Sequence, residues 1–414
     1  MDERPTYIDA DGHLVEHPTG IRDYAPAKYR DRVWHVETDA DGDEWVVMGD
    51  HRQPANVYAA SAVAGFTEEQ KQQAWAGEMR YSDVPGGAYD TKERLAAMDE
   101  DGIDLSVLYP TMLLGIAGYP DTDLALVTAR AYNDWLADHC AESDGRLYGA
   151  AVIPQWDVDL AADEIRRAGA SPHLVAAFLR PNPTIDWLPL SDPAYDPIWK
   201  AACDADLAIG FHPLLMGNVP GACAGLRIDA LGLDTPWGRG EMTLQPPLPG
   251  AEMGYDNHFF AQGIANPVDM MTTVAFLTGG GVFRRFPDLR AVFLEANGGW
   301  IVPWLERLDH HFHEFGFDVP WIDEEPSAYF RRNCWISFDP DESTLAFTAD
   351  SPLVGADRIV WASDYPHPDA KYPGTTRELD EAIAPLSDDQ QVQITGASTG
   401  ALYGIELDSV VPSV

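Results

Sequence analysis

The sequence predicts an α/β fold, a single (β/α)8 (TIM) barrel over residues 1–405. Eight short apolar runs recur along the chain, and helix-like stretches lie between them. Most of these runs are continuously apolar, which is typical of strands buried on both faces of a parallel sheet. Eight such strands that alternate with helices favour a closed barrel. The expected strands are Tyr7–Asp11, Leu105–Tyr109, Tyr148–Ile153, Val175–Leu179, Leu207–Phe211, Ala291–Leu294, Trp335–Phe338 and Ile359–Ala362.

An open, doubly wound sheet is the structural alternative to the barrel. A nucleotide-binding sheet of that kind carries a glycine-rich phosphate loop after an early strand, and neither G-x-G-x-x-G nor G-x-x-x-x-G-K-[ST] follows any of the runs. The glycines at 279–281 are better explained as the end of a helix. The expected helices include Thr91–Asp99, Asp123–Asp138, Leu160–Ala168, Pro193–Asp204, Val268–Thr278 and Trp300–Phe315.

Two insertions lengthen the predicted barrel, residues 18–88 after the first strand and residues 216–266 after the fifth. The first contains a β-hairpin around an Asp-Gly turn, followed by a helix-like stretch over Val57–Arg80. Both insertions leave the carboxyl ends of strands, where barrel enzymes keep their active sites, so we expect them to cover the barrel mouth. Residues 406–414 are expected to form a short solvated tail.

The composition excludes several kinds of partner. The 414 residues include 67 acidic and 27 basic ones, which gives a formal net charge of −40 at pH 7. Such a surface repels nucleic acid and anionic membranes, so the expected partner is a small molecule.

No signal-peptide pattern and no apolar run of membrane-spanning length is present. Without a C-x-x-C pair, Cys140, Cys203, Cys223 and Cys334 are expected to be reduced thiols of a cytoplasmic protein.

Residues that can bind a metal follow three of the predicted strands. The first strand leads to Asp11 and His13, the fifth to His212 and the eighth to Asp364. Alternate residues of a strand share a face, so Asp11 and His13 can point toward one ion. Taken singly, each residue is also explained by a turn or by a hydrogen-bonded core histidine. Together at the mouth of one barrel, they predict a centre for Zn²⁺, Mn²⁺ or Fe²⁺.

Four stretches of the chain, from the first predicted strand to the last, resemble a known superfamily. They are IDADGHLVE, PIWKAACDADLAIGFHP, GGGVFRRFPDLRAVFLEANGGWIVPWLERLD and RIVWASDYPHPDA. They are similar to the amidohydrolase superfamily, in its amidohydrolase-related branch, which includes aminocarboxymuconate-semialdehyde decarboxylase and γ-resorcylate decarboxylase. The resemblance implies a metal-dependent barrel enzyme and places Asp11, His13, His212 and Asp364 on metal-ligand positions.

The sequence departs from this family's pattern at two strand ends. Asp11 stands where the superfamily usually has a His and the decarboxylase branch often has a Glu. Compared with that branch, the change keeps a carboxylate paired with an imidazole. On the turn after strand six, the branch commonly has a His that acts on the substrate in decarboxylases, whereas this chain has Glu295 followed by Ala296. Two explanations remain open for Glu295. It is either a further ligand, which would permit two bridged ions, or a cap of the following helix.

Weaker candidates lie around the predicted mouth. His258, in the second insertion, could reach the site as an acid from a lid or could lie on a surface loop. Arg180, after the fourth strand, could bind a substrate carboxylate or a neighbouring acidic loop. Trp300 could line an apolar pocket or pack its own helix, and His367 could simply pack its loop. Phe259, Phe260 and Trp304 could likewise line an apolar pocket or pack against helices.

The reaction that these residues favour is hydrolysis of an ester, thioester, amide or lactone by metal-activated water. By the resemblance, Asp364 would take the proton from that water and pass it to the leaving group. The carboxylate-rich ligand set and the missing strand-six His favour hydrolysis over the alternative, non-oxidative decarboxylation of an aromatic or unsaturated acid. In that alternative Asp364 or His258 would replace the missing acid. A metal-free binding protein is the non-enzymatic alternative.

We expect each chain to bind one or two divalent metal ions. The resemblance further implies a homodimer or a higher homo-oligomer, for which the insertion at 18–88 is a candidate interface.

Overall fold

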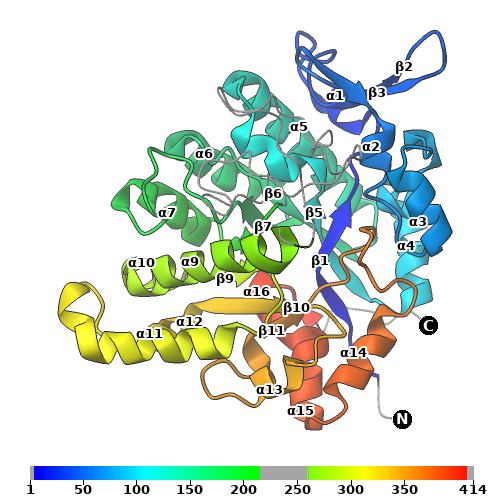
Figure 1. The fold of residues 1–414 in the computed structure, drawn as a ribbon. Coiled ribbons are helices and arrows are strands. Elements are labelled where there is room, and N and C mark those ends of the chain that lie inside the picture. The colour runs from blue at the N-terminus through cyan, green and yellow to red at the C-terminus, as the bar shows by residue number, and fades with distance from the viewer. Residues whose placement is uncertain (1–3, 215–258, 260, 408–414) are drawn as a thin grey trace.

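A computed structural model describes residues 4–214, 259 and 261–407, and in it eight parallel strands form a barrel (Figure 1). Each strand pairs with the next barrel strand along the chain, without the reversal of strand order that a doubly wound sheet has. All eight predicted strands are present, so the predicted barrel is confirmed. The strands are β1 (Ile8–Leu14), β5 (Leu105–Pro110), β6 (Leu147–Val152), β7 (Leu174–Leu179), β8 (Ala208–Phe211), β9 (Ala291–Phe293), β10 (Cys334–Phe338) and β11 (Ile359–Trp361).

The first and last strands meet at the barrel mouth. The amide of Asp364 donates to the carbonyl of Asp11 at 3.2 Å, and the amide of His13 donates to the carbonyl of Tyr365 at 2.8 Å. Nearly all residues of the barrel strands are buried, which explains why the runs in the sequence are continuously apolar. The closure brings the end of β1 beside the segment that follows β11.

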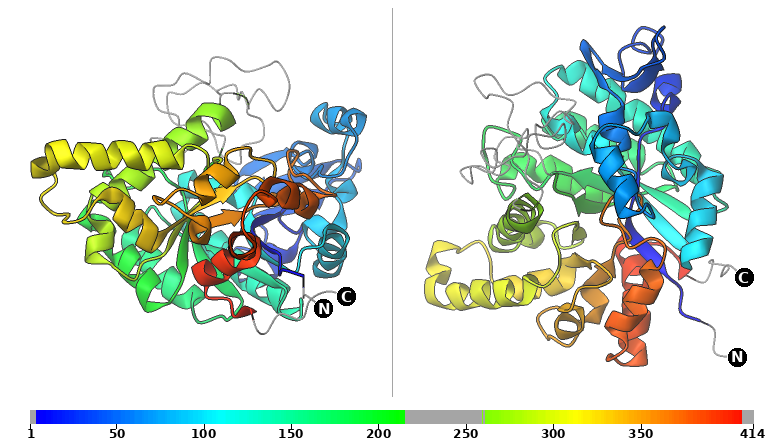
Figure 2. Two further views of the ribbon diagram at one scale, coloured as in Figure 1. Left: turned by 90° about the horizontal axis from the view of Figure 1, so that it is seen from below. Right: turned by 45° about the vertical axis from the view of Figure 1, so that its right-hand side comes forward.

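Helices surround the barrel strands (Figure 2). Two of the longer ones begin at an aspartate whose side chain accepts a backbone N–H, Asp121 for α5 and Asp157 for α6. The predicted helix end at the glycine cluster is confirmed, because α9 stops at Gly279. The helices are α4 (Thr91–Asp101), α5 (Thr122–Ala141), α6 (Val158–Ala168), α7 (Asp196–Asp204), α9 (Asn266–Gly279), α10 (Val282–Arg285), α11 (Ile301–Phe315), α12 (Pro326–Asn333), α13 (Leu345–Ala349), α14 (Thr375–Ile383), α15 (Asp388–Val392) and α16 (Ser398–Tyr403).

The insertion after β1 carries a small antiparallel sheet that projects from the barrel (Figure 1). The predicted hairpin is present, and a third strand pairs with its second arm. The predicted helical stretch consists of two short helices. The insertion contains α1 (Gly20–Tyr24), β2 (His35–Thr38), β3 (Glu44–Met48), β4 (His51–Pro54), α2 (Asn56–Ala59) and α3 (Glu68–Trp75). Most of the second predicted insertion falls on residues 215–258 and 260, outside the described residues.

Below the mouth, Asp9 ties β1 to the strands on either side of it. Its Oδ2 atom accepts hydrogen bonds from Ser106 Oγ at 2.8 Å and from Ser363 Oγ at 2.7 Å. The chain packs closely at Gly12, where an added Cβ would lie 2.6 Å from Asp9 Oδ2 and 2.5 Å from the buried Arg94 guanidinium. A side chain at position 12 would therefore displace the groups that hold the end of β1.

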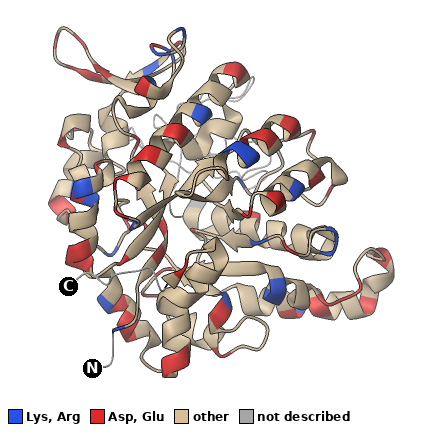
Figure 3. Ribbon diagram, turned by 180° about the vertical axis from the view of Figure 1, so that it is seen from behind, with Lys and Arg blue, Asp and Glu red and all other residues tan. Residues whose placement is uncertain are grey.

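The acidic composition is visible along the ribbon, where Asp and Glu residues are distributed over many elements, with fewer Lys and Arg residues between them (Figure 3). No described helix combines the length and the apolarity needed to cross a membrane. Cys140, Cys203 and Cys334 are free thiols, in agreement with the prediction, and Cys223 lies outside the described residues.

Candidate metal centre

Two side chains of β1 form the base of the candidate centre. The pairing of β1 with β5 shifts register between Asp9 and Gly12, an irregularity of the kind that re-aims side chains next to active sites. Asp11 and His13 are 1% and 0% exposed. The Oδ1 atom of Asp11 is buried and has no hydrogen-bond partner among the described residues. Since an unsatisfied buried carboxylate oxygen is costly, this atom is suited to a bound cation.

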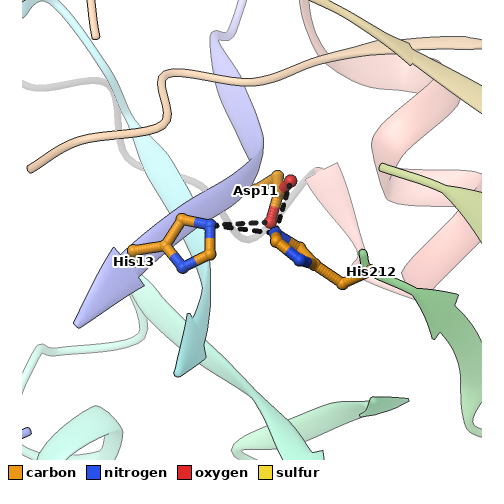
Figure 4. Close-up of side chains that lie close together, drawn as sticks. All are labelled: Asp11, His13 and His212. Carbon is orange, nitrogen blue, oxygen red and sulfur yellow. Dashed lines mark hydrogen bonds and ion pairs between the residues drawn. The ribbon is translucent and has the colours of Figure 1, made fainter. Parts of the chain in front are cut away.

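The imidazole of His212, just after β8, completes a three-residue cluster with this pair (Figure 4). Its Nε2 atom lies 3.2 Å from Nε2 of His13. Asp11 lies beside both rings, with Oδ1 3.6 Å from His13 Nε2 and Oδ2 3.7 Å from His212 Nε2. The three residues predicted from separate parts of the sequence therefore converge on one point.

The hydrogen bonds of the two rings fix which nitrogen carries the proton. His13 Nδ1 lies 2.9 Å from the carbonyl of Pro110, and His212 Nδ1 lies 2.7 Å from the carbonyl of Pro213. A carbonyl only accepts, so each Nδ1 is the N–H donor. Burial lowers the pKa of His13 well below its usual range and the pKa of His212 to about 3, so both rings are neutral near pH 7.

The two Nε2 lone pairs consequently face each other, an arrangement that is repulsive unless a cation lies between them. Two nitrogen ligands about 2.1 Å from one ion would be separated by about 3.0 Å at an angle of about 90° and by about 3.4 Å at a tetrahedral angle. The observed separation of 3.2 Å lies between these values. The residues present therefore fit a divalent metal ion.

Asp364 and Glu295 bring two more carboxylates to this point. Asp364 Oδ1 lies 3.5 Å from His13 Nε2, and Glu295 Oε2 lies 3.2 Å from His212 Nε2. Both residues have left-handed backbone, with φ of 53° and 44°, a strained conformation that is concentrated at functional sites. Burial raises the pKa of both carboxyls well above the usual range, an effect that a cation would reverse. Glu295 does not cap α11, whose cap residue is Trp300 and which has no side-chain cap.

His367 holds the Asp364 carboxylate from the other side. Its Nδ1 lies 2.6 Å from Asp364 Oδ1, and its Nε2 lies 3.0 Å from Thr111 Oγ1. The ring also packs on His13, with centroids 4.2 Å apart. His13, Asp364 and His367 form a second group of metal-binding side chains that overlaps the first. His367 therefore does more than pack its loop, as the sequence suggested, because its hydrogen bond orients Asp364, a candidate ligand.

A pocket opens beside the centre at the ends of β9, β10 and β11. Burial and then the charge of Glu342 raise the pKa of Asp339, on its wall, to about 7. The wall also carries Lys371, whose Nζ lies 2.8 Å from Asp341 Oδ2. The lining residues are Gln262, Glu295, Ala296, Asn297, Asp339, Pro340, Ala362, Ser363, Asp364, Asp369, Ala370 and Lys371.

Sequence reasoning missed Gln262, Asp369 and Lys371 as wall residues. Asp369 and Lys371 lie five and seven residues after Asp364, beyond the end of the strand, and the charge-rich loop that carries them was the only signal.

The other predicted residues lie around this site or outside the described chain. Arg180 is buried, and its guanidinium donates to Asn182 Oδ1 at 3.2 Å. After burial, its charge contributes to the low pKa of His212, so it lies near the centre. Trp300 donates its indole N–H to the carbonyl of Ala296 at 3.0 Å and packs behind the pocket wall. Two predicted residues fall outside the described part of the chain, His258 and Phe260.

The remaining aromatic candidates do not line the described pocket. Trp304 is partly buried, and its indole N–H donates to the carbonyl of Met271 at 2.9 Å. Phe259 is 79% exposed.

Comparison with known proteins places this site in a family. The chain belongs to the amidohydrolase family, whose sequence profile matches residues 8–405. It is 25% identical over 288 residues to a γ-resorcylate decarboxylase of Polaromonas sp. JS666, covering 66% of this chain and 76% of that one. The family resemblance predicted from the sequence is confirmed.

Solved structures show the same fold. An amidohydrolase of Mycobacterium avium subsp. paratuberculosis K-10 superposes with a TM-score of 0.72 at 20% identity, covering 97% of this chain and all of the other. A dihydroxybenzoic acid decarboxylase of Polaromonas sp. JS666, solved with bound manganese and the inhibitor 2-nitroresorcinol, superposes with a TM-score of 0.62 at 17% identity, covering 98% and 99%.

The prediction that hydrolysis is the main reaction is wrong. The curated proteins to which the chain is similar are decarboxylases, the reaction that the sequence offered as the alternative. The argument for hydrolysis relied on the missing strand-six His at Ala296. That absence was weak evidence, because carboxyl groups of Asp339 and Asp364, from neighbouring strands, line the same pocket as Ala296.

Proposed function

We propose that this protein is a metal-dependent, non-oxidative decarboxylase of a small aromatic or unsaturated carboxylic acid. The observation that carries the proposal is the convergence of two neutral imidazoles and a buried carboxylate at the barrel mouth, His13, His212 and Asp11. Similarity to decarboxylases supports the reaction class, and a fold neighbour solved with manganese and an aromatic inhibitor supports the kind of ligand.

The metal would be held by Asp11, His13, His212 and Asp364, with Glu295 close enough to join them. Mixed imidazole and carboxylate sets of this kind suit manganese, zinc and iron. A bound divalent ion would supply positive charge that attracts the substrate carboxylate and stabilises negative charge on the substrate during the reaction. The chain's part is to keep both Nε2 atoms unprotonated and converging, which the Nδ1–carbonyl hydrogen bonds accomplish.

The pocket wall provides groups for substrate orientation. The amides of Gln262 and Asn297 can hydrogen-bond ring hydroxyls, and Lys371 can attract an anionic group. Near His212, Arg180 is the candidate for pairing with a substrate carboxylate. Trp300 shapes the wall from behind Ala296.

Carbon dioxide release tests the proposal. The full chain would be loaded with Mn²⁺ and offered 2,6-dihydroxybenzoate, 5-carboxyvanillate and 2-amino-3-carboxymuconate 6-semialdehyde, with CO2 and the product followed together. We expect one of these acids to yield CO2 and its decarboxylated product in equal amounts, and a chelator to stop the reaction. The proposal is contradicted if no acid yields CO2, or if the loaded protein instead releases an acid from an ester or thioester.

We further propose that the protein is a cytoplasmic homodimer or higher homo-oligomer, with residues 1–405 as one domain. The projecting sheet supports the assembly, because β2 and β4 are its edge strands and edge strands can pair with another chain. Light scattering of the purified chain, beside a variant with proline substitutions in β4, would test it. A monomer in both samples would contradict the assembly.

A further inference from the structure

Decarboxylation requires a proton for the carbon that loses CO2, and the resemblance assigns that task to a strand-six histidine that this chain lacks. We propose that Asp339, at the end of β10, is the acid that protonates this carbon. The inference rests on the proposed function and adds a catalytic residue to it.

Strand order places Asp339 at the centre of the pocket wall. β10 pairs with β9 on one side and with β11 on the other. The end of β10 therefore lies between the strand ends that deliver Glu295 and Asp364. Asp339 lines the same pocket as Ala296, which occupies the position expected for the histidine. An acid on β10 thus faces the space that the missing imidazole would have faced.

Hydrogen bonds hold the Asp339 carboxyl and indicate where its proton lies. The amide of Asn297 donates to Asp339 Oδ2 at 3.0 Å. The backbone N–H of Asp339 donates to Glu342 Oε1 at 3.0 Å, and the same carboxylate accepts from the amide of Gly298 at 3.1 Å. Because Oδ2 is the acceptor for Asn297, the proton of the neutral acid belongs on Oδ1. These hydrogen bonds hold the loop after β9 against the loop after β10. They leave the Oδ1–H of the neutral Asp339 acid to donate a proton.

The surroundings keep this acid partly protonated near neutral pH. Burial, followed by the negative charges of Glu342 and Asp369, raises its pKa to about 7, where a general acid is most effective. Lys371 opposes this shift only weakly. The titratable groups around Asp339 are Asp341 and Glu342 on its own loop, Asp364, Asp369 and Lys371 after β11, and Glu295 after β9.

Other groups in the pocket are less suited to donate a proton to carbon. The Asp369 carboxyl is engaged by a hydrogen bond with Asp364. Lys371 is committed to its ion pair with Asp341. Glu295 and Asp364 are candidate metal ligands, and a ligand carboxylate is ionised.

The step is balanced in atoms and charge. The O–H bond of Asp339 breaks, and its hydrogen forms a C–H bond at the carbon that bears the carboxylate. The bond from that carbon to the carboxylate then breaks, its electron pair returns to the substrate, and neutral CO2 leaves. Asp339 remains as a carboxylate and regains a proton from water after product release. The net change is RCOO⁻ + H⁺ → RH + CO2, without an oxidant or a reductant.

The test compares Asp339→Asn with Asp350→Asn, the same change at an exposed aspartate just after α13 that does not line the pocket. Both are made in the Mn²⁺-loaded full chain, with metal content, kcat for CO2 release from the three acids named above, and the pH profile measured. A second readout is exchange of the product's ring hydrogen for deuterium in D2O, which isolates the proton transfer. We expect Asp339→Asn to retain its metal, lose about 100-fold or more in kcat and lose the exchange. Asp350→Asn should stay within about threefold of the parent.

The parent protein also carries a test that needs no variant. Because the acid must be protonated, kcat should fall as pH rises through about 7. The inference is overturned if Asp339→Asn keeps near-parental kcat and exchange, or if the parental kcat instead rises across that range. Either result leaves the decarboxylase proposal standing, provided that the parent releases CO2. A parent that releases none from any of the three acids overturns the proposed function, and the role of Asp339 with it.

Discussion

The two sides of the barrel mouth differ in chemistry. On the side of β1 and β8, Asp11, His13 and His212 are at most 1% exposed, and the two rings are neutral. On the side of β9 and β11, the side chains of Glu295 and Asp364 are 21% and 16% exposed. Burial lowers the pKa values of the imidazoles on the first side and raises those of the carboxyls on the second.

This difference separates two tasks within one site. The buried side presents unprotonated nitrogens in a fixed geometry, which is what metal binding requires. The more open side presents Asp339, whose pKa burial raises to about 7, together with amides and a lysine, which is what substrate binding and proton transfer require. Substitutions of Asp11, His13 and His212 should therefore act through the metal, and those of Asp339 and Lys371 through turnover or substrate affinity.

The largest expected effect follows from His212→Ala on the buried side. Removal of one converging nitrogen should weaken Mn²⁺ affinity by at least about 100-fold, the upper end of the loss seen when only a residue that orients a ligand is removed. Decarboxylation should fall to background with it. Competition with a fluorescent chelator measures the affinity, and His310→Ala, a change at an exposed histidine of α11, is the matched control. Unchanged metal affinity in His212→Ala would show that the two sides have been assigned incorrectly.

Glu295→Gln tests whether Glu295 is a metal ligand or only a residue of the pocket wall. Its Oε2 lies 3.2 Å from His212 Nε2, so we expect it to share the ion, and its loss to reduce Mn²⁺ affinity by about tenfold. The same competition assay applies, with the exposed Glu306 of α11 changed to Gln as control. If affinity is kept while KM or kcat changes, Glu295 is a wall residue only.

Lys371→Met tests the open side alone. Loss of this cation should raise KM for an anionic substrate by about three- to tenfold and leave kcat and metal content unchanged. Steady-state CO2 release measures both constants, and Lys200→Met, at an exposed ion pair on α7, is the control. A fall in kcat with KM unchanged would instead give Lys371 a role in the chemical step.

The smallest effect concerns the stability of the metal-free protein. The folded-state pKa of Asp339 is about 7, against about 4 when unfolded, so the folded state binds more protons between these values. Stability from this group is thus present at low pH and is lost as pH rises from about 4 to about 7. Asp339→Asn removes that loss, so it should raise Tm by a few degrees at pH 8 and by less at pH 5. Calorimetry of both proteins measures this, and a gain that is larger at pH 5 would contradict the pKa shift.

Most of the fold could be predicted from the sequence, because strands buried on both faces leave continuous apolar runs. The convergence of Asp11 and His13 followed from alternation along one strand, and His212 followed from the rule that strand ends meet at the mouth. What the sequence could not supply was the register shift in β1 and the left-handed backbone of Glu295 and Asp364. Both depend on contacts between strands far apart in the chain.

The reaction was misjudged for a related reason. The absence of a histidine at Ala296 was visible in the sequence, but the neighbouring acid at Asp339 belongs to another strand, 43 residues further along. Only the strand order β9–β10–β11 brings the two positions to one pocket. The pKa of Asp339 likewise depends on burial and on the charge of Glu342, which only the fold reveals.

Anomalous diffraction from crystals of the Mn²⁺-loaded chain tests the central claim most directly. We expect a manganese peak between Nε2 of His13 and Nε2 of His212, within coordination distance of Asp11, with about 2.1 Å from each nitrogen to the ion. A peak confined to the carboxylates at the ends of β9 to β11, or no peak near the two imidazoles, would contradict it.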